Sequence, residues 1–181
     1  MPRVIRAYVR WVDAISIVVG KIMMYGVFAL IGLLIYSTVM RTVFNQPLIW
    51  TVEMGEFMFS AYYFLGGAYV ILLRGHVRMD VFYSKWSSRR QGMTDVAMDF
   101  CLIFYLIVMI VGGINSTVYA VTVQQVKRSV WAPLMWPIKV IILAGIVLML
   151  LQAFSTLFKD VAKARGKDLE DHLSNIHAGE V

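Results

Sequence analysis

The sequence predicts an all-α integral membrane protein with four transmembrane helices and an amphipathic interfacial helix at the N-terminus. Three observations support this fold class. Of the 181 residues, 60% are hydrophobic and only 15% are charged, whereas soluble domains contain roughly 25% charged residues. Four long runs contain no charged residue at all, and the positive charges gather between alternate runs.

Each of the four charge-free runs is long enough to cross a bilayer as a helix. They cover residues 22–40, 57–73, 100–123 and 140–158. At about 1.5 Å per residue, segments of roughly 17–24 residues cross a hydrocarbon core of about 30 Å. We therefore expect one membrane domain, residues 1–160, and a polar tail, residues 161–181, with spans at about 22–40, 55–74, 97–123 and 138–158.

The segment before the first run has the pattern of a helix that lies along the membrane surface. Charged residues recur at helical spacing on one face and apolar residues occupy another: Arg3, Arg6, Arg10 and Asp13 against Ile5, Tyr8, Val12 and Ile15. Such a division is typical of a helix in the lipid headgroup layer, so we expect an interfacial helix over about residues 3–18. The segment does not resemble a signal peptide, because charges interrupt its apolar part.

The distribution of Lys and Arg predicts the orientation of the chain. The N-terminal segment, the connection after the second run and the C-terminal tail are rich in both residues, whereas the first connection contains only Arg41. Because short cytoplasmic loops collect Lys and Arg, we expect both termini and the middle connection in the cytoplasm. Lys127, Arg128 and Lys139 lie on the predicted outer side and fit this rule poorly.

Small and polar residues form a stripe on two of the predicted spans. They lie at helical spacing on one side of each helix: Ser60, Tyr63 and Gly67 on the second, and Gly113, Ser116 and Ala120 on the third. Small residues let helices approach closely in lipid. We expect both stripes to face protein, either in ordinary packing within the bundle or against a partner.

Tryptophans lie near the ends of the predicted spans. Indole prefers the membrane interface, so we expect them to act as interfacial anchors: Trp11, Trp86, Trp131 and Trp136, with Trp50 at the start of the second span.

Glu53 and Glu56 lie in the first turns of the second span, and three interpretations stay open. The two acids could face the positive end of the helix dipole, with Thr51 as the N-cap. They could also pair with Arg41, which ends the first span on the same side of the membrane. A transport site is the third interpretation, but both acids lie at the rim and no charged residue lies in the middle of a predicted span.

The sequence offers no clear site for a cofactor, a metal or a reaction. All three histidines lie outside the predicted spans, so no pair of them can hold a haem between helices. His76 and Asp80 have helical spacing but lack further metal ligands, and we expect them to form a cytoplasmic polar knot with Arg78. We expect neither cofactor nor catalysis, because no nucleotide-binding, nucleophile or cysteine motif is present. The net charge of +6 lies in the loops, which favours a lipid bilayer over nucleic acid as the partner.

Two blocks of the sequence carry a family resemblance. "MRTVFNQPLIWTVEMGEF", residues 40–57, and "YYFLGGAYVILLRGHVRMD", residues 62–80, resemble the small membrane subunit of tripartite ATP-independent periplasmic (TRAP) transporters, the DctQ-like family. "APLMWPIKVIILAGIVLMLLQ", residues 132–152, is similar to the start of that family's fourth helix, with Pro137 in the first turn, where proline is tolerated.

The resemblance implies a small permease subunit in the bacterial inner membrane. In such a system a large membrane subunit carries the sodium and substrate sites, and a periplasmic binding protein delivers an organic acid. The small subunit would brace the scaffold of the large one, and a sodium gradient would drive uptake. The residues of this chain that match the family's motif positions are the following: Arg41, Trp50, Glu53, Glu56, Gly66, His76 and Asp80. We expect the first four to form an outer-face polar cluster or a contact with a partner.

A second function stays open. The chain could be a self-sufficient, homo-oligomeric membrane carrier or channel that uses Glu53 and Glu56 as a cation-attracting ring at a pore mouth.

Overall fold

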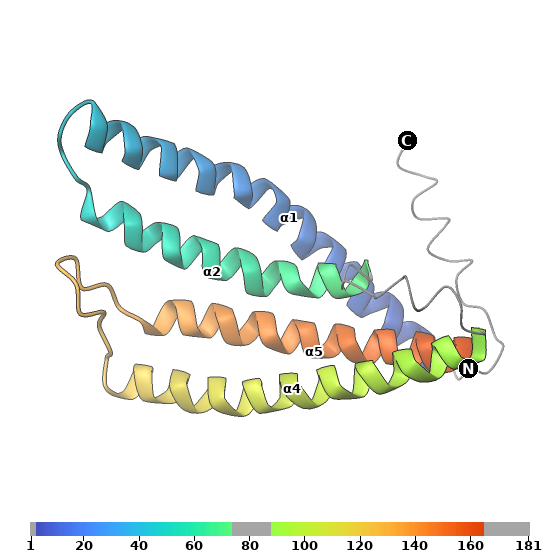
Figure 1. Ribbon diagram of the computed structural model, residues 1–181. Coiled ribbons are helices and arrows are strands. Elements are labelled where there is room, and N and C mark those ends of the chain that lie inside the picture. Colours follow the sequence, from blue (N-terminus) through green and yellow to red (C-terminus); the bar gives the residue numbers. More distant parts are fainter. Residues whose placement is uncertain (1–2, 74–87, 165–181) are drawn as a thin grey trace.

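The computed structural model describes residues 3–73 and 88–164, and this part of the chain forms four helices (Figure 1). Their bounds are Arg3–Thr42 for α1, Ile49–Leu72 for α2, Ser88–Thr122 for α4 and Trp136–Ala164 for α5. The only β-structure within these two ranges is an isolated antiparallel bridge between Val126 and Leu134. The predicted all-helical class and the number of helices are therefore confirmed.

Three of these helices are long and apolar enough to cross a membrane. The candidate spans are Ala7–Thr42, Val96–Thr122 and Trp136–Val161. α2 is not among them, because two acids, three tyrosines and three glycines interrupt its apolar residues. It is nevertheless 24 residues long, or about 36 Å, and it runs beside α1 and α5 (Figure 1). The chain is thus a multi-pass membrane protein.

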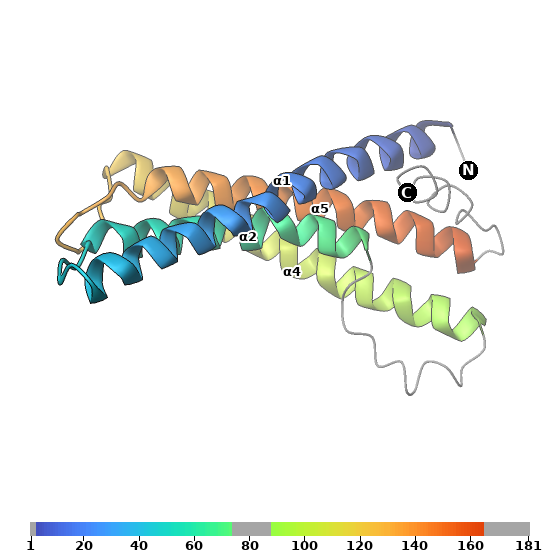
Figure 2. The same ribbon diagram turned by 90° about the horizontal axis from the view of Figure 1, so that it is seen from above.

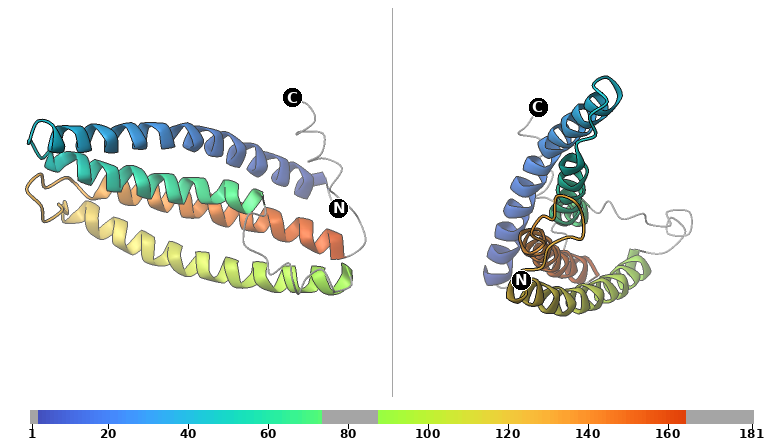
Figure 3. Two further views of the ribbon diagram at one scale, coloured as in Figure 1. Left: turned by 45° about the horizontal axis from the view of Figure 1, so that its top comes forward. Right: turned by 90° about the vertical axis from the view of Figure 1, so that its left-hand side faces the viewer.

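The four helices alternate in direction, so the start of α1 and the end of α5 lie at the same end (Figure 1). At the opposite end they stand in a row in the order α1, α2, α5 and α4 (Figure 3). From there α1 crosses over α2, and its N-terminal half reaches α5 (Figure 2). α5 therefore contacts each of the other three helices.

Small residues allow α5 to pack closely between its neighbours. A Cβ atom added at Gly145 would lie 2.8 Å from the carbonyl carbon of Phe64, so α2 and α5 nearly touch at the backbone there. On its other side α5 contributes Ile146 and Ala153 to an apolar core shared with α4, which supplies Ile103 and Leu106. Many remaining large apolar side chains on α1 and α4 are exposed and available to lipid or to another protein.

The predicted interfacial helix over residues 3–18 is wrong. These residues form the first part of α1, which continues without a break to Thr42 and whose apolar stretch begins at Ala7. At 40 residues the helix is about 60 Å long, roughly twice the thickness of the hydrocarbon core. The prediction placed Asp13 on the water-facing side, but Asp13 is buried because α5 supplies polar partners for it.

Candidate functional site

Polar side chains gather in two clusters at opposite ends of the helices. The loop-end cluster lies where α1 meets α2 and comprises Arg41, Glu53, Glu56 and Lys127. The terminal-end cluster lies between the first part of α1 and the last part of α5, and it comprises Asp13, Ser16, Gln152, Ser155 and Lys159.

The loop-end cluster lines a pocket of about 350 Å³. Two serines, Ser37 and Ser129, and a series of apolar residues complete its walls: Pro47, Leu48, Ile49 and Val52. Pockets for small ligands have volumes of roughly 300–1,000 Å³, mostly apolar walls and a few convergent polar groups. The pocket thus has the size and composition of a small binding site.

Glu56 forms an ion pair with Lys127, which comes from the connection between α4 and α5. Two backbone bonds fold that connection back on itself: Lys127 N–H donates to the Pro133 carbonyl at 3.0 Å, and Met135 N–H donates to the Gln125 carbonyl at 2.8 Å. The fold of this connection therefore brings a cation to the start of α2. The side chains of both partners are partly exposed, so water screens their attraction.

Glu53 has no such partner within residues 3–73 and 88–164. Its side chain is only 4% exposed, and its Oε2 atom is buried without a hydrogen-bond partner in the described part of the chain. Arg41 lines the same pocket but is exposed, and it makes no ion pair with any residue of the two described ranges. The pocket therefore combines a buried acid and an exposed base that do not meet each other.

The start of α2 is tied to α1 by hydroxyl groups. Thr51 is fully buried, and its hydroxyl donates to the Leu48 carbonyl at 2.7 Å. The Ser37 and Thr51 hydroxyl oxygens lie 2.8 Å apart and share a second hydrogen bond, which links α1 to α2. The prediction of Thr51 as the N-cap is wrong, since Leu48 occupies that position without a side-chain cap bond.

The predicted stripes divide between packed and exposed positions. Gly67 lies against Met149 of α5, Gly113 lies against Leu143 of α5, and Ala120 is fully buried. The other members are more open: the Ser60 hydroxyl donates to the Glu56 carbonyl, Tyr63 is 65% exposed, and the exposed Ser116 accepts a bond from Lys139 at its carbonyl. The glycines and Ala120 thus lie in or beside helix contacts, whereas Tyr63 faces outward.

The predicted anchors lie on the surface wherever the structure describes them. Four tryptophans are exposed: Trp11, Trp50, Trp131 and Trp136. Trp86 and the predicted polar knot of His76, Arg78 and Asp80 lie outside the described residues. The anchoring role stays a prediction, as does the division into a membrane domain and a polar tail.

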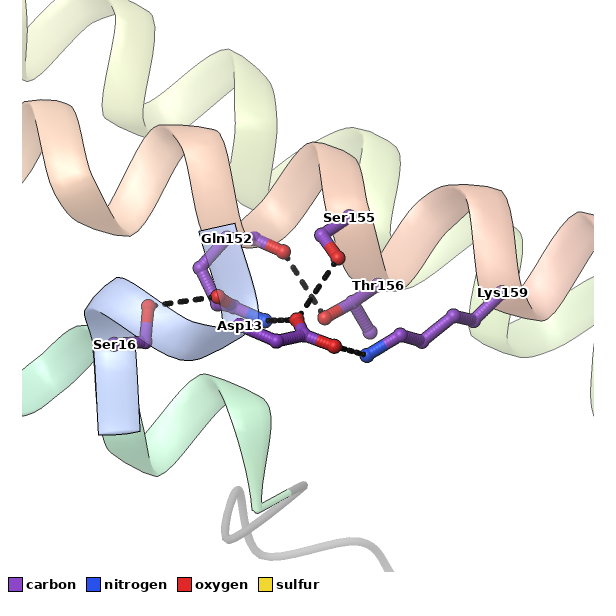
Figure 4. Close-up of polar contacts among 6 residues, drawn as sticks. All are labelled: Asp13, Ser16, Gln152, Ser155, Thr156 and Lys159. Carbon is purple, nitrogen blue, oxygen red and sulfur yellow. Dashed lines mark hydrogen bonds and ion pairs between the residues drawn. The ribbon is translucent and has the colours of Figure 1, made fainter. Parts of the chain in front are cut away.

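Asp13 is the centre of the terminal-end cluster (Figure 4). Its Oδ2 atom accepts a bond from Lys159 Nζ at 2.6 Å, and its Oδ1 atom accepts bonds from Gln152 Nε2 at 2.9 Å and Ser155 Oγ at 3.1 Å. The Ser16 hydroxyl donates to Gln152 Oε1 at 2.8 Å. The carboxylate and the amide are therefore satisfied where α1 crosses α5, so the cluster joins these two helices.

Sequence reasoning missed this cluster, although a signal was present. Gln152, Ser155 and Lys159 are spaced by three and four residues, so they share one face of a helix. Asp13 and Ser16 share a face of α1 in the same way. Each set alone predicts a polar patch, but no local pattern indicates that the two patches meet.

The described residues contain no group of three or more His, Cys, Asp or Glu that could hold a metal ion. Asp13 is neutralised by Lys159, and Glu56 by Lys127. Glu53 is therefore the acid of the two clusters that is available to a group from outside the chain.

A comparison with protein families decides the assignment. The family described as "Tripartite ATP-independent periplasmic transporters, DctQ component" matches residues 30–163. The chain belongs to this family. The resemblance seen in the sequence is thus confirmed, and the DctQ component is part of a transporter and not an enzyme. The match includes the whole loop-end cluster but begins after Asp13 and Ser16. Searches of curated proteins and of solved structures found no match.

Proposed function

We propose that this DctQ component is the small permease subunit of a sodium-driven TRAP transporter in the bacterial inner membrane. It braces the scaffold of the large membrane subunit while that subunit takes up organic acids delivered by a periplasmic binding protein. The observation that carries this proposal is where the charges lie. A long stretch of each helix contains no charged residue: residues 22–40 of α1, 57–72 of α2, 100–122 of α4 and 140–158 of α5.

The helix contacts support a bracing role over a transport pathway. Carriers that bind ions or solutes by themselves place polar groups or broken helices near the bilayer midplane. Here the middle of α5 packs through Gly145 against Phe64 and through Met149 against Gly67, and each helix is continuous. Such contacts favour a rigid unit with no polar path through it.

The proposed topology has α2 as a fourth span and both termini in the cytoplasm. α2 lies beside α1 and α5, which are candidate spans, and its length of about 36 Å is enough to cross a bilayer. The loop-end cluster then faces the periplasm. The exposed apolar faces of α1 and α4 are available to the large subunit, and lipid covers what the large subunit leaves free.

Co-purification with the large membrane subunit tests this assignment. The tagged chain, co-expressed with the large TRAP membrane subunit of the same organism, should retain that subunit through detergent extraction and size-exclusion chromatography. An unrelated four-helix membrane protein with the same tag is the control. Extraction of the chain as a homo-oligomer that excludes the large subunit would instead favour a self-sufficient carrier or channel.

A further inference from the structure

The pocket at the loop-end cluster contains an acid whose charge the described part of the chain leaves uncompensated. Glu53 is 4% exposed, and its Oε2 atom has no hydrogen-bond partner there. A buried carboxylate without a partner is costly, so such a group in a native fold requires a proton, a cation or a donor from outside. Glu56 does not share this need, because it is paired with Lys127.

The same pocket also contains a positive charge that the described part of the chain leaves without a counter-charge. Arg41 lines the pocket, is exposed, and makes no ion pair within residues 3–73 and 88–164. With Glu56 and Lys127 neutralising each other, one buried negative and one exposed positive charge are left. A ligand that matches both must carry an ammonium group for Glu53 and an anionic group for Arg41.

The position of the pocket along the helices points to the source of such a ligand. Glu53 stands four residues after the first residue of α2, Ile49, or about 6 Å along the helix axis. The headgroup layer on each side of a bilayer is roughly 5–8 Å thick, given a core of about 30 Å within a total of about 40–45 Å. Trp50 directly follows the lining residue Ile49 and is exposed, and tryptophan is a residue type that prefers this layer.

We propose that this pocket binds the headgroup of a zwitterionic aminophospholipid, with phosphatidylethanolamine as the ligand. The ammonium group donates to Glu53, and the phosphate lies against Arg41. The acyl chains leave past the apolar wall of Ile49 and Val52 toward the hydrocarbon core. An ethanolamine ammonium has three N–H donors, as a lysine side chain does, and thus supplies both a counter-charge and a donor for the Glu53 carboxylate that lines the pocket.

Native mass spectrometry of the purified full-length chain in detergent tests the proposal directly. The probes are phosphatidylethanolamine, phosphatidylcholine and phosphatidylglycerol with identical acyl chains. Choline has no N–H donor and glycerol has no positive charge, so wild-type protein should bind phosphatidylethanolamine about tenfold or more tightly than either. Equal binding of the three lipids would overturn the proposal without reference to any variant.

Variants locate the binding within the pocket. Glu53→Gln should abolish the preference for phosphatidylethanolamine, whereas Arg41→Gln should weaken phosphatidylethanolamine and phosphatidylglycerol alike. Thr38→Val is the control, because Thr38 lies one turn before Arg41 on α1, is not a lining residue of the pocket and donates its hydroxyl to the Leu34 carbonyl of its own helix. It should retain the wild-type ranking. A preference that survives Glu53→Gln, or that Thr38→Val abolishes equally, would contradict the assignment.

The lipid measurement uses this chain alone, so its outcome is independent of the proposed bracing role. If Glu53→Gln left lipid binding unchanged but weakened co-purification with the large subunit, the pocket would receive a basic side chain of that subunit. The lipid proposal would then be wrong, while the proposed function would stand.

Discussion

Lys159 Nζ lies 2.6 Å from Asp13 Oδ2, and the ion pair joins residues that are 146 positions apart in the sequence. Both side chains are mostly buried, with 15% and 12% of their surfaces exposed. The pair fixes the first part of α1 onto the last part of α5 (Figure 4). It therefore joins the first and last helices at the end where α1 begins and α5 ends.

Breaking this pair should destabilise the protein. Asp13→Asn or Lys159→Gln leaves a mostly buried partner without its counter-charge, so each should lower the free energy of unfolding by about 2–3 kcal/mol. In a double-mutant cycle followed by unfolding in detergent, the two changes should couple by at least about 1 kcal/mol. Purely additive losses would mean that the pair does not hold α1 to α5.

Gly145→Ala should loosen the contact between α2 and α5. Its new methyl group would lie 2.8 Å from a backbone atom of Phe64, which cannot rotate away, and overpacking of this kind costs about 1–3 kcal/mol. Gly112→Ala is the matched control, because nothing lies within 4 Å of its added methyl and the helix should gain up to about 1 kcal/mol. Thermal unfolding of both variants in the same detergent checks the contrast. Equal melting temperatures would show that α2 and α5 are not in close contact.

The ion pair between Glu56 and Lys127 should contribute far less than the buried pair. With 56% and 29% of the two side chains exposed, Lys127→Gln should cost only about 0.2–1 kcal/mol. The effect should shrink further as salt is raised, because the exposed charges are screened, whereas the effect of Lys159→Gln should change little. Unfolding at low and high ionic strength measures this difference. If the destabilisation by Lys127→Gln and by Lys159→Gln depended equally on salt, the predicted difference between the two ion pairs would be wrong.

Cysteine labelling should establish the orientation. Cys101 is the only cysteine and is exposed, so Cys101→Ser supplies the background. Cysteines introduced at Asn45 or Val130, in the two connections at the loop end, should react with a membrane-impermeant maleimide added outside spheroplasts. A cysteine at Ala164, at the end of α5, should react only after the membrane is permeabilised. The reverse pattern would place the loop-end cluster in the cytoplasm.

The sequence predicted the helical architecture well, because charge-free runs of suitable length depend only on local composition. It failed for residues 3–18, where the segregation of Arg6 and Arg10 from Ile5 and Tyr8 is the same for a helix on lipid and for a helix on protein. What distinguishes the two is Gln152, Ser155 and Lys159 on a distant helix. Non-local polar partners of this kind cannot be read from one segment.

The sequence predicts only part of the loop-end cluster, because one of its members comes from a distant connection. Glu53 and Glu56 were singled out from their rim position, and the structure brings them into one pocket with Arg41. The cation that pairs with Glu56 is Lys127, which the orientation rule treated as an exception on the outer side. Its position depends on how the connection between α4 and α5 folds back, and the charge pattern alone does not encode that fold.

In the proposed function, this chain braces the large subunit of a transporter and moves no solute itself. The most direct test is sodium-dependent uptake of labelled organic acids into proteoliposomes that contain this chain alone, the large subunit alone, or both, each with the binding protein outside. The account predicts uptake only when both membrane subunits are present. Solute movement by this chain alone, or full uptake by the large subunit without it, would contradict the account.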